Sequence, residues 1–288
     1  MKLTTKLLTR SFIYLILAVA AFVCLYPFYV MVISSLRDLS SIFDAYWPPT
    51  HLTTQAYRDI FTSNQDIRVT DNVILNFEVP FTRHFFNSLL VSVLRTFLTV
   101  TLCAMAGFAF SKYRFPGKNA LFILVLFTMM IPPAVTLIPL FYVMQFLGWI
   151  NTYQALIVPG LASAFGVFWM RQYMQSIPDE LLDQGRIDGC TAFGLFLRII
   201  LPLSRPGLGI LAILIFVGSW GDFLWPLIVL QSQELFTIPV FLSSMNGAVS
   251  QSNPLTMAGS VLATLPIIII YLIFRRQLID GLIVGAIK

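Results

Sequence analysis

The residues that could do chemistry gather in one charged stretch, residues 176–189, which reads SIPDELLDQGRIDG. Clustered carboxylates can transfer protons in an active site or bind a metal. Here they share a helical pattern with leucine and isoleucine and do not form a ligand array, so the pattern predicts a contact surface. Such a helix could dock into the groove of a soluble partner or rest on a membrane surface. Its acidic balance disfavours an anionic membrane surface.

Local signals divide this stretch and its continuation into a short helix, a turn and a second helix. Ser176 is predicted to cap a helix of about residues 178–187, because a serine hydroxyl accepts a bond from the free N–H groups of a first turn. Gly189 is predicted to end that helix, since glycine adopts a left-handed backbone without a steric penalty. A second helical stretch, Thr191–Leu201, is predicted to end before Pro202.

The chain shows no motif for handling nucleotides or metals by itself. The GxxxxGK[ST] phosphate-binding loop does not occur in its 288 residues. The three cysteines and two histidines have no metal-ligand spacing. The sequence therefore predicts a chain that is not itself an ATP-hydrolysing enzyme and holds no cofactor or metal of its own.

Composition places the chain in a membrane. Hydrophobic residues make up 58% of it and charged residues 11%, whereas soluble domains carry about 25% charged residues. So few charges cannot build a water-facing surface, and lipid must cover much of the protein. The net charge of +5 comes without a run of lysine and arginine, which argues against nucleic-acid binding.

Charged residues divide the apolar sequence into six predicted transmembrane spans. Residues 119–170 contain no charge, and as one helix they would extend about 78 Å, more than twice the roughly 30 Å of a bilayer core. They therefore form two spans, broken at the polar turn 148–152. The six spans are 11–36, 83–112, the two parts of 119–170, 206–230 and 255–274.

Lysine and arginine predict how these spans are oriented. With the N-terminus inside, the inner segments hold 13 of the 18 basic residues and the outer segments 4, while Arg95 lies within a span. This excess predicts that both termini are cytoplasmic. The predicted organisation is a cytoplasmic N-terminus (1–10) followed by one transmembrane domain (11–288), with an outer loop at about 37–83, an inner loop at about 171–205 and a cytoplasmic tail at about 275–288.

Residues 177–206, IPDELLDQGRIDGCTAFGLFLRIILPLSRP, resemble the cytoplasmic EAA loop of binding-protein-dependent ABC importer permeases. In that family Glu-Ala-Ala is followed by a glycine and later by Ile-x-Leu-Pro. Asp183, Gln184 and Gly185 stand at the Glu-Ala-Ala positions, so one carboxylate is shorter by a methylene and two alanines are replaced. Gly189 takes the place of the glycine, and Pro202 closes the motif. NSL at 87–89, WGDFLWPL at 220–227 and GAIK at 285–288 extend the resemblance, which is to the maltose-permease type and begins at about residue 12.

The resemblance implies an all-α membrane protein with the six-helix fold of type I ABC importer permeases and a coupling helix in the inner loop. It implies the permease subunit of a sugar importer in the bacterial inner membrane, for an oligosaccharide or polysaccharide fragment as much as for a disaccharide. The implied partners are a second permease subunit, two cytoplasmic ATPase subunits that bind ATP and Mg²⁺, an extracytoplasmic solute-binding protein and the sugar.

The resemblance also implies which residues touch the ATPase. The implied coupling residues are Asp183, Gln184, Gly185, Arg186, Asp188, Gly189 and Pro202. In the maltose type the C-terminal tail reaches the ATPase dimer as well, which implies the same contact for Gly285 and Lys288 here.

Four residues of the apolar spans are weaker candidates for the sugar pathway, namely Arg95, Trp220, Asp222 and Trp225. An intramembrane charge is a functional candidate by default, but Arg95 could also snorkel to the interface, and Asp222 could cap a helix or pair locally. An ion-coupled secondary transporter remains the alternative function, and a membrane-embedded enzyme is a third. The secondary transporter should show inverted repeats and paired intramembrane acids, which this sequence does not clearly show.

Overall fold

The computed structural model describes residues 2–38, 52–62, 66–70, 73–76, 79–248 and 254–286, with side chains described for 10–38, 52–62, 79–245 and 254–275. These residues are mostly helical, as predicted. The exception is an antiparallel hairpin of β1 (Asp66–Thr70) and β2 (Val73–Asn76). Of the two predicted tail contacts, Gly285 lies near the end of the last helix, and Lys288 lies outside the described residues.

Three helices are long and apolar enough to cross a membrane without interruption. They are α1 (Lys2–Ser35), α3 (Phe81–Lys112) and α14 (Pro254–Ala286). Their apolar stretches have 26, 32 and 22 residues. At 1.5 Å per residue each stretch reaches across a hydrocarbon core of about 30 Å.

Three further candidate spans are helices interrupted by a bend. Helix α4 (Lys118–Thr128) meets α5 (Pro133–Phe146) at 97°. The stretch of α6 (Tyr153–Ile157) and η2 (Val158–Leu161) meets α7 (Ala164–Gln175) at 42°. The stretch from α9 (Ala192–Leu195) through η3 (Phe196–Ile200) to α10 (Leu201–Leu203) meets α11 (Arg205–Trp220) at 78°. The described residues reach six spans only if each bent pair is one span, so the count of six stays a prediction.

Of two predicted span boundaries, the structure contains one and contradicts the other. The break at 148–152 is present, because Gly148 and Asn151 adopt positive φ angles of 67° and 60° between α5 and α6. The single span predicted for 206–230 is wrong. Helix α11 ends at Trp220, and a short helix, α12 (Leu224–Val229), follows after a gap that contains Asp222.

The chain divides into two compact units, which are residues 1–82 with 242–265 and residues 83–241 with 266–288. In the first unit, the hydroxyl groups of Ser35 and Tyr57 lie 2.7 Å apart and join the end of α1 to α2 (Gln55–Asp59). Most of α1 is exposed within this unit; Phe22, for example, is 67% exposed. Lipid or protein outside this unit must therefore cover the apolar surface of α1.

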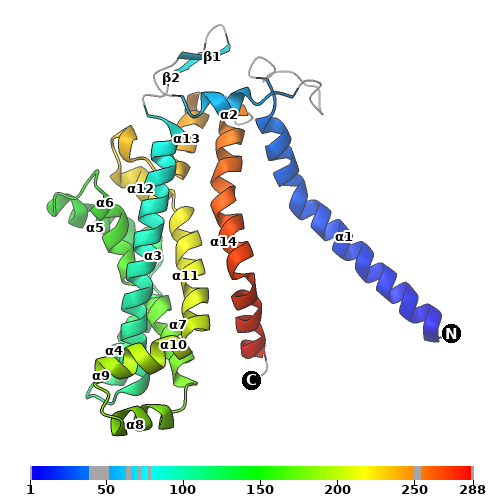
Figure 1. Cartoon of the computed structure of the whole chain (residues 1–288). Helices are drawn as coiled ribbons and strands as arrows, with labels where there is room; N and C mark the ends of the chain where they lie inside the picture. Colours follow the sequence, from blue (N-terminus) through cyan, green and yellow to red (C-terminus); the bar gives the residue numbers. More distant parts are fainter. Residues whose placement is uncertain are drawn as a thin grey trace. The chain divides into compact units, whose positions relative to one another are not determined.

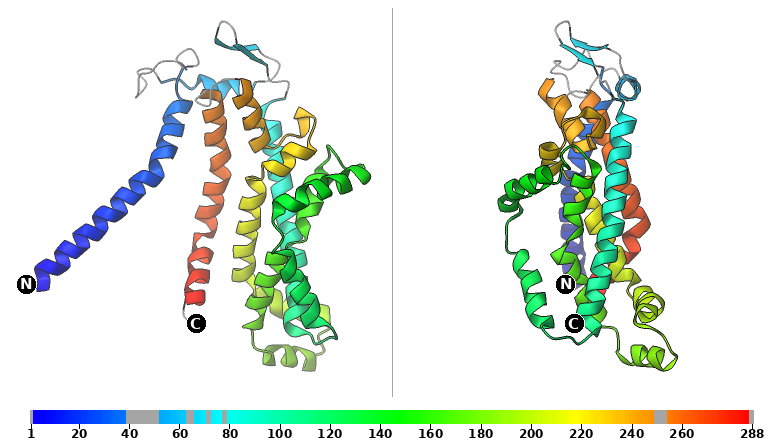
Figure 2. Two further views of the ribbon diagram at one scale, coloured as in Figure 1. Left: turned by 180° about the vertical axis from the view of Figure 1, so that it is seen from behind. Right: turned by 90° about the vertical axis from the view of Figure 1, so that its left-hand side faces the viewer.

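The second unit packs α3, α7 and α11 against one another (Figure 1, Figure 2). The helices approach closely because two glycines lie at their crossings. A Cβ on Gly107 of α3 would lie 2.6 Å from Met170 Cβ on α7, and a Cβ on Gly207 of α11 would lie 2.6 Å from the ring of Tyr173. The Trp169 indole also donates to the Gly207 carbonyl over 2.9 Å.

A distant segment, made of η4 (Gln233–Leu235) and the start of α13 (Ile238–Ala248), is bound to the first turns of α3 by Asn87, which is fully buried. Its amide nitrogen donates to the carbonyl groups of Glu234 and Phe236 over 2.8 and 3.1 Å. Its amide oxygen accepts from the Tyr153 hydroxyl over 2.7 Å. Ser88 accepts from the backbone N–H of Ile238 over 2.8 Å. Asn87 and Ser88 of the NSL motif therefore have a structural role in this unit, because they bind the backbone of residues 234–238.

Replacing Asn87 by alanine is expected to lower the free energy of unfolding by about 1–3 kcal/mol, because buried partners lose their hydrogen bonds. Thermal unfolding of the purified protein in detergent would show this as a lower midpoint. Asn119→Ala is the control, because Asn119 is exposed at the start of α4. Equal midpoints for the two variants would contradict the role assigned to Asn87.

Candidate functional site

The charged stretch forms helix α8 (Glu180–Ile187), which lies at one end of the second unit (Figure 1). Only Leu182 and Gly185 of this helix are buried. Leu182 joins a core cluster that includes residues of α3, α7 and α11. The remaining side chains point outward, and Ile187 is 85% exposed. Helix α8 thus fixes one narrow face to its own chain and leaves a mixed polar and apolar face free for a contact.

The end of α8 follows the prediction for Gly189. This glycine has φ of +81°, and a Cβ built on it would meet nothing within 4 Å. The N–H of Gly189 donates to the Arg186 carbonyl over 3.1 Å, and the N–H of Cys190 donates to the Gly185 carbonyl over 2.9 Å. These two bonds form a Schellman motif, which needs a left-handed residue at this position. Backbone conformation, not space, therefore requires glycine here.

The start of α8 differs from the prediction for Ser176. Its hydroxyl donates to the Tyr173 carbonyl over 2.7 Å at the end of α7, so Ser176 does not cap α8. The helix begins at Glu180, two residues later than predicted, with Asp179 at its N-cap position. The carbonyl of the preceding helix is nearer in sequence and competes for the serine hydroxyl.

Lys112, the last residue of α3, secures the segment before α8. Its ammonium group donates to the Ile177 carbonyl and, over 2.7 Å, to the Asp179 carboxylate. The Lys112 side chain is only 4% exposed, whereas that of Asp179 is 77% exposed. The hydrogen bond from Lys112 holds the pKa of Asp179 below its ordinary value, so this carboxylate keeps its charge to a lower pH than an unpaired aspartate does. Sequence reasoning missed Lys112, which it counted only as an inner basic residue.

Gly185 has a packing role that the sequence did not indicate. A Cβ at this position would lie 2.6 Å from the methyl groups of Leu195 and Ile199. The glycine therefore lets α8 lie directly on α9 and η3, the segments that lead back to α11. An alanine here, as in the family pattern, would push those two flexible side chains aside.

The return segment, which consists of α9, η3 and α10, begins as predicted and ends later than predicted. Thr191 caps α9, because its hydroxyl accepts from the N–H of Gly194 over 3.2 Å. The prediction that this stretch ends before Pro202 is wrong: a π-helical turn, η3, is followed by α10, which contains Pro202, and the chain bends only at Ser204. A proline ring clashes with the carbonyl four residues earlier in a regular helix, and the wider π turn just before Pro202 relieves this conflict.

The charges of α8 are mostly paired or exposed. Arg186 donates to Asp183 over 2.6 Å within the helix, with side chains 51% and 63% exposed. Such an exposed pair contributes little to stability. Asp183 therefore already has a basic neighbour, yet it stays open to a second one. Gln184 and Asp188 are exposed on the same helix and its end.

The four weaker candidates lie elsewhere in the second unit. Arg95 and Asp222 form an ion pair over 3.1 Å. Trp220 is 3% exposed and packs between the rings of Phe85 and Phe216. Trp225 is half-buried, and its indole N–H donates to the Ala155 carbonyl over 2.8 Å.

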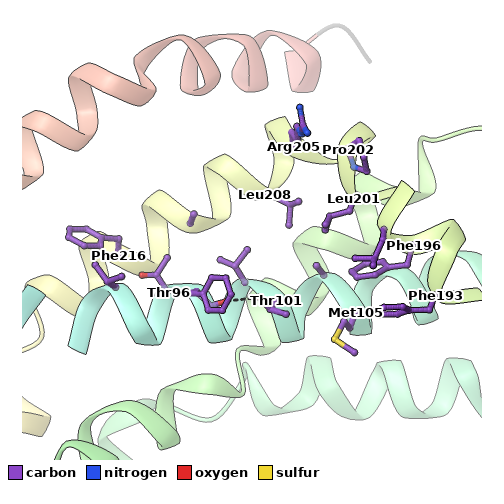
Figure 3. Close-up of a pocket in the computed structure, with 16 residues that line it drawn as sticks. Thr96, Thr101, Met105, Phe193, Phe196, Leu201, Pro202, Arg205, Leu208 and Phe216 are labelled. Carbon is purple, nitrogen blue, oxygen red and sulfur yellow. Dashed lines mark hydrogen bonds between the residues drawn. The ribbon is translucent and has the colours of Figure 1, made fainter. Parts of the chain in front are cut away.

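An apolar cavity of about 790 Å³ lies between α3, α11 and the return segment (Figure 3). Phe193, Phe196 and Phe216 line it, with Arg205 at one end. This lining offers few partners to the many hydroxyl groups of a sugar, so the cavity does not support a sugar site within this chain. In the part of the chain with described side chains, no three His, Cys, Asp or Glu residues gather as metal ligands.

Residues 99–283 match the family described as "Binding-protein-dependent transport system inner membrane component". The chain is 45% identical over 204 residues to the arabinooligosaccharides transport system permease protein AraQ of Bacillus subtilis (strain 168), covering 71% of this chain and 73% of the relative. It is 37% identical over 273 residues to the protein of the same name from Halalkalibacterium halodurans, covering 94% of each.

The fold also matches a solved structure, that of a bacterial ABC transporter involved in the import of the acidic polysaccharide alginate. The TM-score is 0.75 at 20% identity, over 91% of this chain and 94% of that one. At this identity the match shows a shared fold.

Proposed function

Because the chain belongs to the family of binding-protein-dependent transport system inner membrane components, and is thus an inner-membrane permease subunit of an ABC importer, we propose that its cargo is an oligosaccharide. The names of the two relatives support this class, since both refer to arabinooligosaccharides. Arabinooligosaccharides are therefore the first substrates to test.

The complex we propose contains a second permease subunit, two ATPase subunits that bind ATP and Mg²⁺, and an extracytoplasmic binding protein. Helix α8 is the contact with one ATPase. The observation that carries this assignment is the exposed outer face of a helix that its own chain holds by Leu182, Gly185 and the segment bound to Lys112. A helix held in this way can transmit a displacement to the helices behind it.

In this mechanism, closure of the ATPases on ATP moves α8, and two connections carry the motion into the membrane. One runs from Gly185 through α9 and η3 to α11. The other runs from Asp179 through Lys112 to α3. The helices then rock between inward-open and outward-open states around the sugar. Both termini of the chain are cytoplasmic in this proposal.

Uptake of an arabinooligosaccharide into proteoliposomes tests the proposal. The complete complex would be reconstituted with its binding protein, once with intact ATPases and once with ATPase variants that bind ATP without hydrolysing it. We expect uptake to fall to background with the inactive ATPases. Uptake that continues on a proton or sodium gradient without nucleotide would instead favour a secondary transporter.

A further inference from the structure

The ion pair of Arg95 and Asp222 joins two helices that are far apart in the sequence. Arg95 Nη1 donates to Asp222 Oδ2 over 3.1 Å, and the residues are 127 positions apart. Arg95 lies 14 residues from the start of α3 and 17 from its end, about 21 and 26 Å along the helix axis. The pair is thus near the middle of a span, and both side chains are about a quarter exposed, at 23% and 26%.

Two interrupted helices meet α3 at this pair. Asp222 lies in the gap between α11 and α12, directly after Gly221. The Arg95 guanidinium rests on Gly160 in η2, close enough that a Cβ on this glycine would overlap with Arg95 Nε. Thr99, one turn further along α3, donates to the Gly160 carbonyl over 3.3 Å. The bend of 42° between η2 and α7 follows within three residues.

Stability alone does not explain a charged pair at this depth. Charges within a membrane span are costly, and a pair removed from water is often no more stabilising than apolar side chains of similar size. Interrupted helices at membrane depth are tolerated where protein or water covers their backbone, and in transporters such breaks lie at the moving, substrate-handling region. The location of this pair at two breaks therefore points to a role in motion.

We propose that the Arg95–Asp222 pair is a latch that holds α3 against the gap between α11 and α12 and opens during the transport cycle. The inference rests on the proposed function. When the segment from Gly221 onward moves, each charged group exchanges its partner for water in the transport pathway. About a quarter of each side chain is not covered by this chain. Arg95 and Asp222 are positioning residues in this proposal and do not bind the sugar.

Two variants open the latch in different ways. Arg95→Met combined with Asp222→Leu removes both charges and leaves apolar side chains of similar size. Gly160→Ala keeps both charges but displaces the guanidinium from its position on Gly160. Thr101→Val is the control on α3, because the Thr101 hydroxyl is exposed and, among the described residues, bonds within its own helix, to the Phe97 carbonyl.

The test measures ATP hydrolysis with and without the binding protein, sugar transported per ATP, and the KM for the sugar, all in the reconstituted complex. Both latch variants are expected to raise the rate of ATP hydrolysis without binding protein about fivefold. The amount of sugar transported per ATP should fall by a similar factor. About fivefold is the factor given by the smallest typical coupling energies between sites. The KM and the Thr101→Val complex are expected to stay at wild-type values.

Three results would overturn the latch. The first is wild-type hydrolysis and transport in both variants. The second is wild-type behaviour of Gly160→Ala when the double variant fails to assemble, because the pair would then be structural only. The third is a raised KM with an unchanged maximal rate, since the side chains would then bind the sugar. None of these results depends on a proton or sodium gradient, so a failure of the latch is distinguishable from a failure of the proposed function.

Discussion

Gly189→Val is expected to reduce uptake about tenfold or more while the protein still folds and inserts. The φ of +81° at this residue costs an L-amino acid about 1–2 kcal/mol, and a β-branched residue more. Since about 1.4 kcal/mol corresponds to a factor of ten, most molecules would lose the Schellman motif that ends α8. The helix would then present a displaced face to the ATPase, and sugar uptake in proteoliposomes would measure the loss.

Two controls separate this local effect from general instability. Gly117 has φ of +79° and open space around its missing Cβ, just as Gly189 has, but it lies in the turn between α3 and α4. Gly117→Val therefore imposes the same backbone cost outside the α8 contact and should leave uptake within about threefold. Gly189→Asn should be milder than valine, because asparagine tolerates the left-handed region. Equal losses of uptake in Gly117→Val and Gly189→Val would contradict the role assigned to Gly189 at the end of α8.

The features that the sequence predicted correctly depend on neighbouring residues. Gly189 comes just after an amphipathic helix. Thr191 stands just before a helix, and its hydroxyl accepts from the N–H of Gly194, three residues later. The polar turn at 148–152 separates two apolar runs. Each of these signals lies within a few residues, so the local backbone preference and the final structure agree.

The features that the sequence missed depend on tertiary contacts or on competition. Arg95 and Asp222 were singled out separately, but only the folded chain brings together residues 127 positions apart. Gly185 was identified only from the family pattern, as a replacement of an alanine, although its missing side chain allows the contact with Leu195 and Ile199. The Ser176 hydroxyl could accept from an N–H of the following helix or donate to a carbonyl of the preceding one. It donates to the Tyr173 carbonyl.

Lys112→Met is the second substitution with a large expected effect. Methionine is an unbranched, apolar side chain that fills the space of a buried lysine without its charge. It leaves the Ile177 carbonyl and the Asp179 carboxylate without their donor. The bond from the buried Lys112 ammonium group to the buried Ile177 carbonyl contributes about 1.5–3 kcal/mol, whereas the bond to the exposed Asp179 carboxylate adds little because water screens it. Loss of the first bond alone should detach the segment before α8 from α3 in a large fraction of molecules.

The expected result is loss of coupling with retained assembly. ATP hydrolysis would continue, while sugar transported per ATP would fall by about tenfold, the factor that 1.4 kcal/mol gives. Lys118→Met is the matched control, because Lys118 also donates to backbone carbonyls, including that of Tyr113 over 2.8 Å. These bonds lie at the turn between α3 and α4 and do not reach the segment before α8. Lys118→Met should keep the wild-type ratio of sugar to ATP. If both lysine variants lowered this ratio equally, the Lys112 bond to the α8 segment would not be a route by which motion reaches α3, and α11 alone would have to carry it.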